Sequence, residues 1–411
     1  MSPPEAGRLR ALVIANRLPF PLDDGWKVRT FHMVRSVAAL ADTTLLVFHP
    51  GEDADLAGAR EAFGSGVHIV HRPAPRAYTV AALVRGLVTR TPVHVWNQES
   101  PALAATLDAL QAEGRYDICV AETTFVYRHV ERLHRATLRV IDTHNIDSVT
   151  MSRYATTLTS LPRRLYAHVT ARKLRAFERR VFADADLVWV CSRTEHEIVR
   201  EMAPGTSAAV VPNGVDTAWM APAQRAEEVP GRLVFFGRMD YFPNVDGLAW
   251  FAREVLPLIR VQVPGVQLQV LGPAATDAVR ALAAADPSIV LLGRVDDVRP
   301  VLESAAVVVV PLRAGGGTRL KIVEALSMAR PVVSTAIGAE GLDLAADREI
   351  VLADAPEEFA ARVVALLGDG VARRRLGDAG RAAVRARYDW GRIGEVAREG
   401  LLRAAADRRP R

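Results

Sequence analysis

Cysteine is almost absent from this 411-residue sequence, which contains only Cys119 and Cys191. Both lie in apolar runs and cannot form the disulfide framework of a small secreted domain, so the expected compartment is a reducing cytosol. No apolar run is long enough to span a bilayer, and the run near the N-terminus is too short for a signal peptide. These absences predict a cytoplasmic protein.

A strong excess of one charge is also missing. The formal net charge is +5 and the pI about 9.5, with arginines spread along the chain. A basic surface attracts nucleic acid, anionic lipid or phosphorylated ligands. No nucleic-acid-binding signature is present, so nucleic acid is not an expected partner. Half of the residues are hydrophobic, as in a soluble globular protein, and the length predicts two domains.

Short apolar runs alternate with helical stretches in two series. Continuous apolar strands between helices are typical of parallel sheets covered on both faces. The predicted fold class is therefore α/β, with two Rossmann-like, doubly wound domains. The expected strands lie at 11–16, 44–48, 67–70, 117–122, 138–142, 186–192 and 208–212, and then at 232–237, 266–272, 288–293, 305–312, 331–335 and 349–353.

The break between the two series indicates the domain boundary. Residues 213–231 are rich in Ala, Pro and Glu and have no periodicity, which predicts a linker. The first domain is then 1–212 and the second 232–387. Residues 388–411 contain an amphipathic helix that is free, on the sequence alone, to pack on either domain.

The stretch RAGGGTRLKIVEAL (313–326) follows an apolar run and leads into a helical pattern. Ligands of doubly wound sheets bind at the carboxyl ends of strands. Gly315, Gly316 and Gly317 allow close backbone approach, and Thr318 is the expected N-cap. The free N–H groups and the helix dipole predict an anion site, with a diphosphate as its guest. The alternative is a glycine turn without a ligand; the Walker A pattern is absent.

Several longer stretches resemble family 4 glycosyltransferases. They are PNGVD (212–216), FFGRMDYFPNVDGLAWFAREVLPLI (235–259), GRVDDVRPVLESAAVVVVPL (293–312), GGGTRLKIVEALSMARPVVST (315–335), GAEGL (338–342) and IDTHNIDSV (141–149). The resemblance is greatest to bacterial sugar transferases of polysaccharide gene clusters. It implies a GT-B fold, in which two domains face across a cleft, and a retaining, metal-independent transfer without a cofactor.

The resemblance also assigns donor-binding residues in the second domain. Glu324 corresponds to the family's second motif glutamate, which holds the donor ribose, whereas the first falls on Gly316. Arg238 corresponds to the arginine that binds the donor diphosphate, but the lysine expected five residues later is Pro243. Lys321 or Arg319 is the predicted substitute for that lysine. Arg294 and Val295 are expected near the nucleobase.

In the first domain, the resemblance places His144 near the donor sugar, although a histidine that merely ends a strand is an equal alternative. Asn145 is a neighbouring polar candidate on the acceptor side, and Asp142 is expected to form a turn. Gly25 corresponds to a glycine loop that faces the donor phosphates or the acceptor. Asp24, Lys27 and Arg29 are the acceptor-side candidates in the same loop, where both cations would draw an anionic acceptor or line a solvated helical turn.

The resemblance implies a nucleotide-sugar donor and a sugar, lipid-linked or small-molecule acceptor. No metal is expected, since the Asp-Ala-Asp stretches at 53–55 and 184–186 are interpreted as charges on helix ends. The basic segment 161–182 fits either a membrane surface or core packing, and predicts at most a weak peripheral contact at the inner membrane face. A nucleotide-sugar 2-epimerase, a natural-product transferase and a non-catalytic binder remain alternatives.

Overall fold

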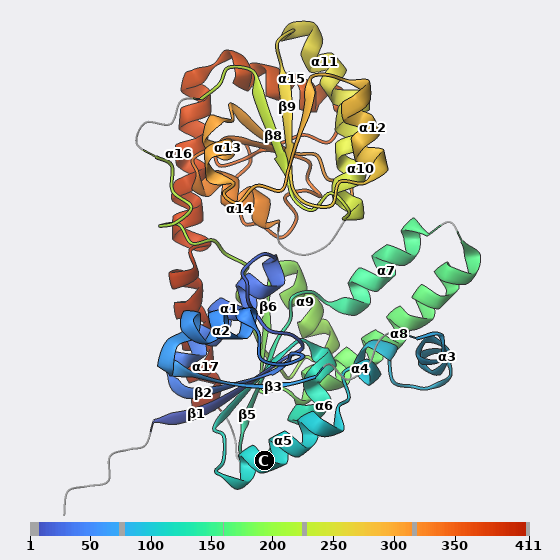
Figure 1. Cartoon of the computed structure of the whole chain (residues 1–411), viewed down its shortest axis with the longest axis vertical. Coiled ribbons are helices and arrows are strands. Elements are labelled where there is room, and N and C mark those ends of the chain that lie inside the picture. Colours follow the sequence, from blue (N-terminus) through green and yellow to red (C-terminus); the bar gives the residue numbers. More distant parts are fainter. Residues whose placement is uncertain (1–7, 74–78, 159, 224–227, 315–318, 408–411) are drawn as a thin grey trace, which may run out of the picture. The chain divides into compact units, whose positions relative to one another are not determined.

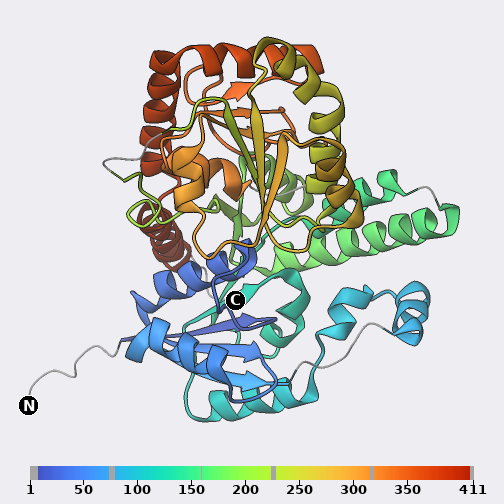
Figure 2. The same cartoon turned by 45° about the horizontal axis from the view of Figure 1, so that its top comes forward.

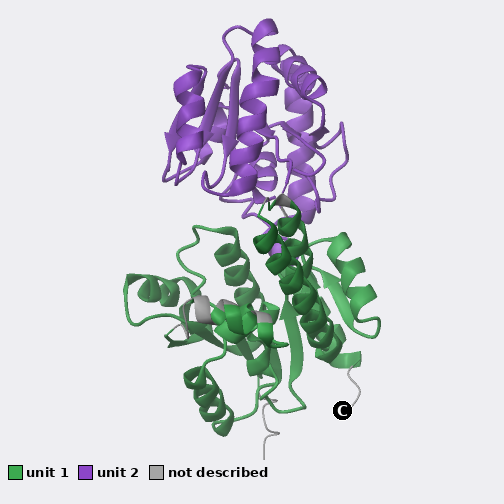
Figure 3. Cartoon of the chain, turned by 90° about the vertical axis from the view of Figure 1, so that its right-hand side faces the viewer, with its two compact units in different colours: residues 1–212, 394–411 green, residues 213–393 purple. Residues whose placement is uncertain are grey.

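A computed structural model describes residues 8–73, 79–158, 160–223, 228–314 and 319–407. The chain forms two compact units, coloured separately in Figure 3. Unit 1 comprises Met1–Pro212 with Gly394–Arg411, and unit 2 comprises Asn213–Ile393. Gly315 to Thr318, the centre of the predicted anion loop, lie outside the described residues.

Unit 1 is built on a seven-stranded parallel sheet with the order β3-β2-β1-β4-β5-β6-β7 (Figure 1). Its strands are β1 (Leu9–Ala15), β2 (Ala41–Phe48), β3 (Val67–Arg72), β4 (Ile118–Glu122), β5 (Leu138–Asp142), β6 (Leu187–Val190) and β7 (Ser207–Val210). Its helices are α1 (Gly25–Ala38), α2 (Ala54–Phe63), α3 (Val80–Val88), α4 (Val93–Asn97), α5 (Pro101–Ala112), α6 (Tyr127–Val130), α7 (Asp147–Thr157), α8 (Leu161–Asp184) and α9 (Arg193–Met202).

Unit 2 repeats this plan with a six-stranded parallel sheet in the order β10-β9-β8-β11-β12-β13. Its strands are β8 (Arg232–Phe236), β9 (Gln267–Leu271), β10 (Ile289–Gly293), β11 (Val307–Val310), β12 (Val332–Ser334) and β13 (Val351–Leu352). Its helices are α10 (Phe242–Trp250), α11 (Leu256–Gln262), α12 (Asp277–Ala285), α13 (Arg299–Ser304), α14 (Leu320–Ser327), α15 (Pro356–Gly368) and α16 (Gly370–Arg387), followed by α17 (Trp390–Asp407).

Every strand predicted from an apolar run is present, so the predicted α/β class with two doubly wound sheets is confirmed. The central strand β11 shows why: Val307 to Val310 have no exposed surface. Such strands are covered by helices on both faces and therefore have no polar alternation. In both sheets the strand order reverses at one place, between β1 and β4 and between β8 and β11. These switch points are where doubly wound proteins bind ligands.

The expected linker at 213–231 instead belongs to unit 2. Val215 and Met220 are buried in the hydrophobic core of that unit, and the Val215 amide donates to the carbonyl of Tyr388 at 2.8 Å. Isolated apolar residues in a proline-rich stretch give no periodic signal, so the sequence did not reveal this packing. The C-terminal helix α17 begins in unit 2, and its residues from Gly394 onward belong to unit 1.

Helices α7 and α8 form a hairpin that extends from the sheet of unit 1 (Figures 1 and 2). The Lys173 ammonium donates to the carbonyls of Gly86 and Thr89, both at 2.8 Å, and so ties α8 to the end of α3. The core-packing interpretation of the basic segment 161–182 is confirmed for its second half, where Leu174, Phe177, Val181 and Phe182 are buried. None of the described helices combines the length and the apolar character needed to cross a membrane.

Candidate active site

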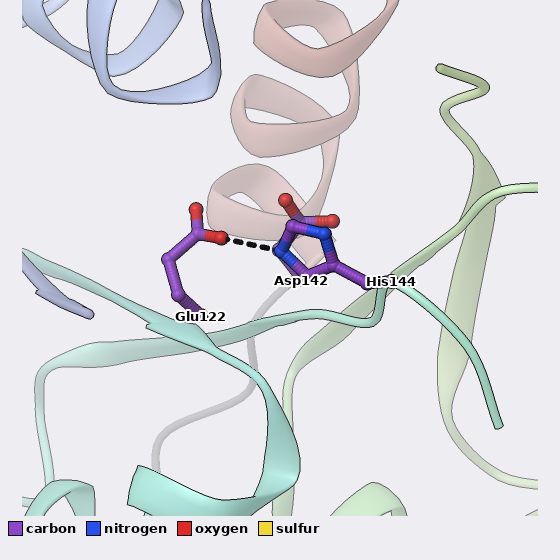
Figure 4. A group of neighbouring side chains, drawn as sticks. All are labelled: Glu122, Asp142 and His144. Atoms are coloured by element: carbon purple, nitrogen blue, oxygen red, sulfur yellow. Dashed lines mark hydrogen bonds and ion pairs between the residues drawn. The ribbon is translucent and has the colours of Figure 1, made fainter. Parts of the chain in front are cut away.

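The carboxyl edge of the unit 1 sheet carries a group of buried ionisable side chains (Figure 4). Glu122 and Asp142 are the last residues of β4 and β5 and face each other in register. His144 follows β5, and its Nε2 lies 2.9 Å from Oε2 of Glu122. The parallel register therefore brings together side chains from two successive strands, next to the switch point between β1 and β4.

Arg29 is the cation of this group. Its Nε donates to Oδ1 and Oδ2 of Asp142 at 3.0 and 3.1 Å, and its Nη1 donates to the Val211 carbonyl at 2.7 Å. Both members of the pair have no exposed surface. The predictions of Arg29 as an acceptor-drawing or solvated cation and of Asp142 as a turn-former are therefore wrong. The first turn of α1 packs over the end of β5, so Arg29 points inward.

His144 is held as a neutral imidazole. Trp26 stacks on its ring, with centroids 5.4 Å apart and an interplanar angle of 22°. Burial lowers the pKa of His144 to about 3; the charge of Asp142 opposes this shift, and the Arg29 and Arg17 guanidinium groups add to it. Burial also raises the pKa of Glu122 to about 7, against the opposing effects of Arg29 and the Thr30 hydroxyl. His144 is thus a largely buried hydrogen-bonding group with a lowered pKa.

A metal ion is not required to explain this cluster. One ligand atom from each of Glu122, Asp142 and His144 lies within 4.8 Å of the others. However, the guanidinium of Arg29 already occupies both oxygens of Asp142, so the three side chains do not form an open set of donors. The Asp-Ala-Asp stretches have structural hydrogen bonds: Asp53 caps α2, and Asp184 accepts from Tyr127 and Arg139.

The remaining acceptor-side candidates lie at the start of α1. Gly25 is the first residue of the helix, and Asp24 caps it by accepting from the Lys27 amide at 2.9 Å. The Lys27 ammonium pairs with Asp23 at 2.8 Å, so its charge is compensated locally. Asn145 is half-buried in the turn after His144. This turn places Asn145 and His144 on the same edge of the sheet.

In unit 2, the carboxyl end of β8 meets the first turn of α14. The Lys321 ammonium donates to Oδ1 of Asn244 at 2.6 Å and lies 4.6 Å from the centre of the Phe235 ring. Asn244 in turn donates to the carbonyl of Arg238 at 2.7 Å. Burial lowers the pKa of Lys321 to about 7, the charge of Arg319 adds to this shift, and the charge of Glu324 opposes it. Lys321 therefore gains from an anionic partner.

Gly237 leaves room for this arrangement. Its φ is 142°, and a Cβ added there would lie 2.9 Å from Nδ2 of Asn244 and 3.0 Å from Nζ of Lys321. Asn244 directly follows Pro243, the position at which the family pattern expects a lysine. The ammonium of Lys321 thus bonds to the residue next to the position at which the family pattern expects a lysine.

The other donor-side candidates are arranged differently. The Arg238 side chain is 62% exposed and pairs with Asp240 at 2.7 Å, so a ligand would have to compete with that carboxylate. Glu324 is half-buried on α14, and burial raises its pKa to about 7. Arg319, rather than the predicted Thr318, occupies the N-cap position of α14, and it is 7% exposed.

Two further predictions fall at the end of β10 and one stretch lies outside the described residues. Gly293 has a φ of 68°, and Arg294 follows it as an exposed side chain. Val295 is partly buried against the unit 2 core. The donor-site candidates Gly315, Gly316, Gly317 and Thr318 lie outside the described residues.

Sequence reasoning missed Glu122, Trp26 and Asn244. Glu122 had a usable signal, because it ends an apolar strand that pairs with the strand preceding His144. Trp26 lies between two residues already singled out, but nothing in the pattern indicates that its ring stacks on a residue 118 positions away in the chain (144 minus 26). Asn244 could have been noticed as the neighbour of Pro243.

Comparison with known proteins finds glycosyltransferases among the relatives of this chain. Residues 230–369 match the model of a family described as glycosyl transferases group 1. Phosphatidyl-myo-inositol mannosyltransferase of Mycobacterium tuberculosis is 34% identical over 199 residues, which cover 45% of this chain and 51% of the relative. Glycogen synthase of the same species is 27% identical over 233 residues, covering 54% and 55%. The chain thus matches about half the length of these relatives.

Solved structures resemble the chain over nearly its whole length. TarM of S. aureus has a TM-score of 0.72 at 11% identity and covers 97% of this chain and 99% of its own. Sucrose-phosphate synthase of Thermosynechococcus elongatus has a TM-score of 0.70 at 17% identity, covering 96% and 98%. HepE of Anabaena, solved with UDP and glucose, has a TM-score of 0.64 at 14% identity, covering 96% and 99%. The chain therefore has the GT-B fold, and its residues 230–369 are similar to the group 1 glycosyltransferases.

Proposed function

We propose that the protein is a retaining glycosyltransferase that moves a sugar from a nucleoside-diphosphate sugar to an acceptor hydroxyl. The observation that carries this proposal is the half-buried ammonium of Lys321 beside Asn244 and Gly237 at the switch point of unit 2. A cation whose pKa is lowered by burial is stabilised when an anion arrives beside it. A diphosphate fits this requirement, and HepE and TarM were both solved with UDP.

In the proposed reaction, the bond between the anomeric carbon and the diphosphate oxygen breaks. The acceptor oxygen bonds to that carbon from the same face, and the acceptor proton passes to the departing phosphate oxygen. Lys321, Arg238 and the amides of the glycine loop stabilise the negative charge that develops on the diphosphate. Glu324 holds the ribose, and neutral His144 hydrogen-bonds to the donor sugar. No protein carboxylate is needed as a base.

The acceptor is assigned only as a class. The mannosyltransferase relative acts on phosphatidyl-myo-inositol by its name, and a TarM structure contains α-GlcNAc-glycerol. We extend these to a hydroxyl-bearing sugar, lipid-linked or small-molecule acceptor in glycan, polysaccharide or glycolipid assembly. The charge balance of the unit 1 site supports a neutral acceptor group, because Arg29 is paired with Asp142 and Lys27 with Asp23.

A panel of nucleotide sugars tests the proposal. Thermal shift should identify one donor, since a ligand at about 100 times its Kd adds roughly 2.7 kcal/mol to the free energy of unfolding. That donor should be hydrolysed slowly with retention at the anomeric carbon, as read by proton NMR, and the rate should survive excess EDTA. Absence of any shift with all donors and with UDP or GDP would overturn the proposal. Release of an epimerised free sugar would indicate an epimerase, and binding without turnover a non-catalytic binder.

A further inference from the structure

We propose that Glu122 is the positioning residue for His144: it fixes the orientation of the imidazole and decides which ring nitrogen carries the proton. Through its bond to Nε2, Glu122 determines whether the Nδ1 edge of the ring offers a hydrogen-bond donor or a lone pair. The proposal concerns the site assigned above and rests on the proposed function for its use in catalysis. The tautomer itself is a property of unit 1 and is measurable without any substrate.

The orientation of the ring is fixed from two directions. At its edge, Oε2 of Glu122 lies 2.9 Å from Nε2, as the dashed line in Figure 4 shows. On its face, the ring of Trp26 stacks on the imidazole with 5.4 Å between the centroids. The guanidinium of Arg17 in turn lies over the Trp26 ring, 4.5 Å from its centre. An imidazole held at one edge and one face has little freedom to flip, so Nε2 remains the nitrogen that meets Glu122.

Glu122 is itself fixed. Its side chain is fully buried, and the Thr30 hydroxyl donates to the same oxygen, Oε2, at 2.9 Å. Its second oxygen, Oε1, is buried and has no hydrogen-bond partner in the described part of the chain. The carboxyl group therefore directs its hydrogen bonding through Oε2, between Thr30 and His144. The contacts with Thr30 and His144, both at 2.9 Å, therefore hold the carboxyl group from the same oxygen.

The surrounding charges decide how many protons the pair holds. Glu122 faces Arg29 and Asp142, and His144 faces these two and also Arg17 and Asp24. Arg29 is bonded directly to Asp142, and its charge also attracts Glu122 and opposes the effect of burial on that carboxyl group. Burial raises the pKa of Glu122 to about 7 and lowers that of His144 to about 3. Near neutral pH the imidazole is therefore uncharged on either side of the Glu122 titration.

The two protonation states of Glu122 then require two tautomers of His144. Below a pH of about 7, the protonated carboxyl donates from Oε2 to Nε2, and the ring proton lies on Nδ1. Above it, Nε2–H donates to the carboxylate, and Nδ1 presents a lone pair. Between these states one proton is lost to solvent from Nδ1 while the shared proton moves from Oε2 to Nε2. The ring edge thus changes from donor to acceptor without ever becoming charged.

Long-range proton–nitrogen NMR of protein labelled with 15N-histidine tests this, because the two tautomers have distinct nitrogen shifts. Signals of His144 are assigned by their loss in His144→Gln. The wild-type ring should change from the Nδ1–H to the Nε2–H form between pH 6 and about 8.5. Glu122→Gln cannot titrate and should keep one tautomer over that range. The matched control is Glu178→Gln, which removes another buried carboxylate with a pKa raised to about 7, bonded to the Ser148 amide; it should behave as wild type.

Thr30→Val provides a second variant if Glu122→Gln fails to fold. It removes the hydroxyl that lowers the pKa of Glu122 and should move the midpoint of the tautomer change to higher pH. The proposal is overturned if wild-type His144 keeps one tautomer from pH 6 to about 8.5, if its ring becomes doubly protonated above pH 6, or if Glu122→Gln leaves the change intact. Because no donor is present, these outcomes are independent of whether the protein transfers sugars.

Discussion

Arg29 and Asp142 form a fully buried ion pair in which the guanidinium Nε lies 3.0 Å from Oδ1 and 3.1 Å from Oδ2 of the carboxylate. The pair joins the first turn of α1 to the end of β5, and Nη1 of Arg29 extends the connection to the chain after β7. Burial raises the pKa of Asp142 despite the attraction of Arg29. The pair therefore connects three segments of the chain beside His144, and each of its charges is stabilised by the other.

Removing one partner should be far more costly than losing a surface pair. Asp142→Asn leaves the Arg29 guanidinium buried without its counter-charge, and we expect the free energy of unfolding to fall by about 3–5 kcal/mol. The control is Asp108→Asn, which breaks the exposed pair with Arg132 and should cost no more than about 1 kcal/mol. Urea denaturation of both variants measures the difference. Equal losses would mean that the buried pair is not needed to compensate Arg29.

Lys321 supplies the second test, in unit 2. We expect Lys321→Ala to weaken the binding of UDP or of the identified donor's diphosphate and to slow transfer, by about 3 kcal/mol if the ammonium stabilises charge on the leaving group. The matched control is Arg253→Ala, which removes an exposed cation of the same unit. Isothermal titration calorimetry and steady-state kinetics read the effect. Wild-type affinity and rate in Lys321→Ala would remove this residue from the site.

The pH dependence of diphosphate binding follows from the same residue. Burial lowers the pKa of Lys321 to about 7, so the free site loses its charge as the pH rises through this value. Affinity for a nucleoside diphosphate should therefore be higher at pH 6 than at pH 8, with proton uptake on binding that appears as a dependence of the calorimetric heat on the buffer. The same shift predicts that stability contributed by this group rises between pH 7 and about 10.5, where only the unfolded chain holds the proton. In Lys321→Met both dependences should flatten; their persistence would assign them to another group.

The fold was predictable because each buried parallel strand appears in the sequence as one local apolar run. The run Val307 to Val310 can be identified as a strand without reference to the rest of the chain. The site was only partly predictable. Arg29 sits in the first turn of α1, where sequence alone suggests a solvated cation, and its partner Asp142 is 113 residues away. The same holds for Lys321 and Asn244, which are 77 residues apart. Such pairs depend on strand order, and that order is a property of the folded sheet.

Gly237 tests whether the space beside Lys321 matters. Its φ of 142° disfavours any other residue, and the Cβ of Gly237→Ala would press on Asn244, which is held by its bond to the Arg238 carbonyl. We expect a loss of about 1–3 kcal/mol in the free energy of unfolding, together with weaker diphosphate binding. Gly265→Ala is the control, since nothing lies within 4 Å of its Cβ. A stable Gly237→Ala protein with unchanged affinity would contradict the assignment of Gly237, Asn244 and Lys321 to the diphosphate site.

The hairpin of α7 and α8 raises the question of membrane contact. The arginines at 163, 164, 172, 175 and 179 are exposed, whereas Lys173 is bonded to two carbonyls and Arg180 pairs with Glu131. Each free cation near an anionic leaflet contributes about 1 kcal/mol, and salt screens it. Leu161 and Leu165 at the start of α8 are each 66% exposed. Burying them would add roughly 1.5–3 kcal/mol each, which does not exceed the cost of association by itself.

We therefore expect weak binding to anionic vesicles at low salt, loss of that binding at high salt, and none to neutral vesicles. Replacing Leu161 and Leu165 with serine should weaken the low-salt binding further, because the two side chains stand next to Arg163 and Arg164 and can enter the interface only where those charges hold the helix against it. The control is Val261→Ser on α11, which removes an 82% exposed apolar side chain of unit 2 and should change nothing. Vesicle sedimentation of the full chain measures all three proteins. Salt-resistant binding to neutral vesicles would instead require an apolar insertion surface larger than these two leucines.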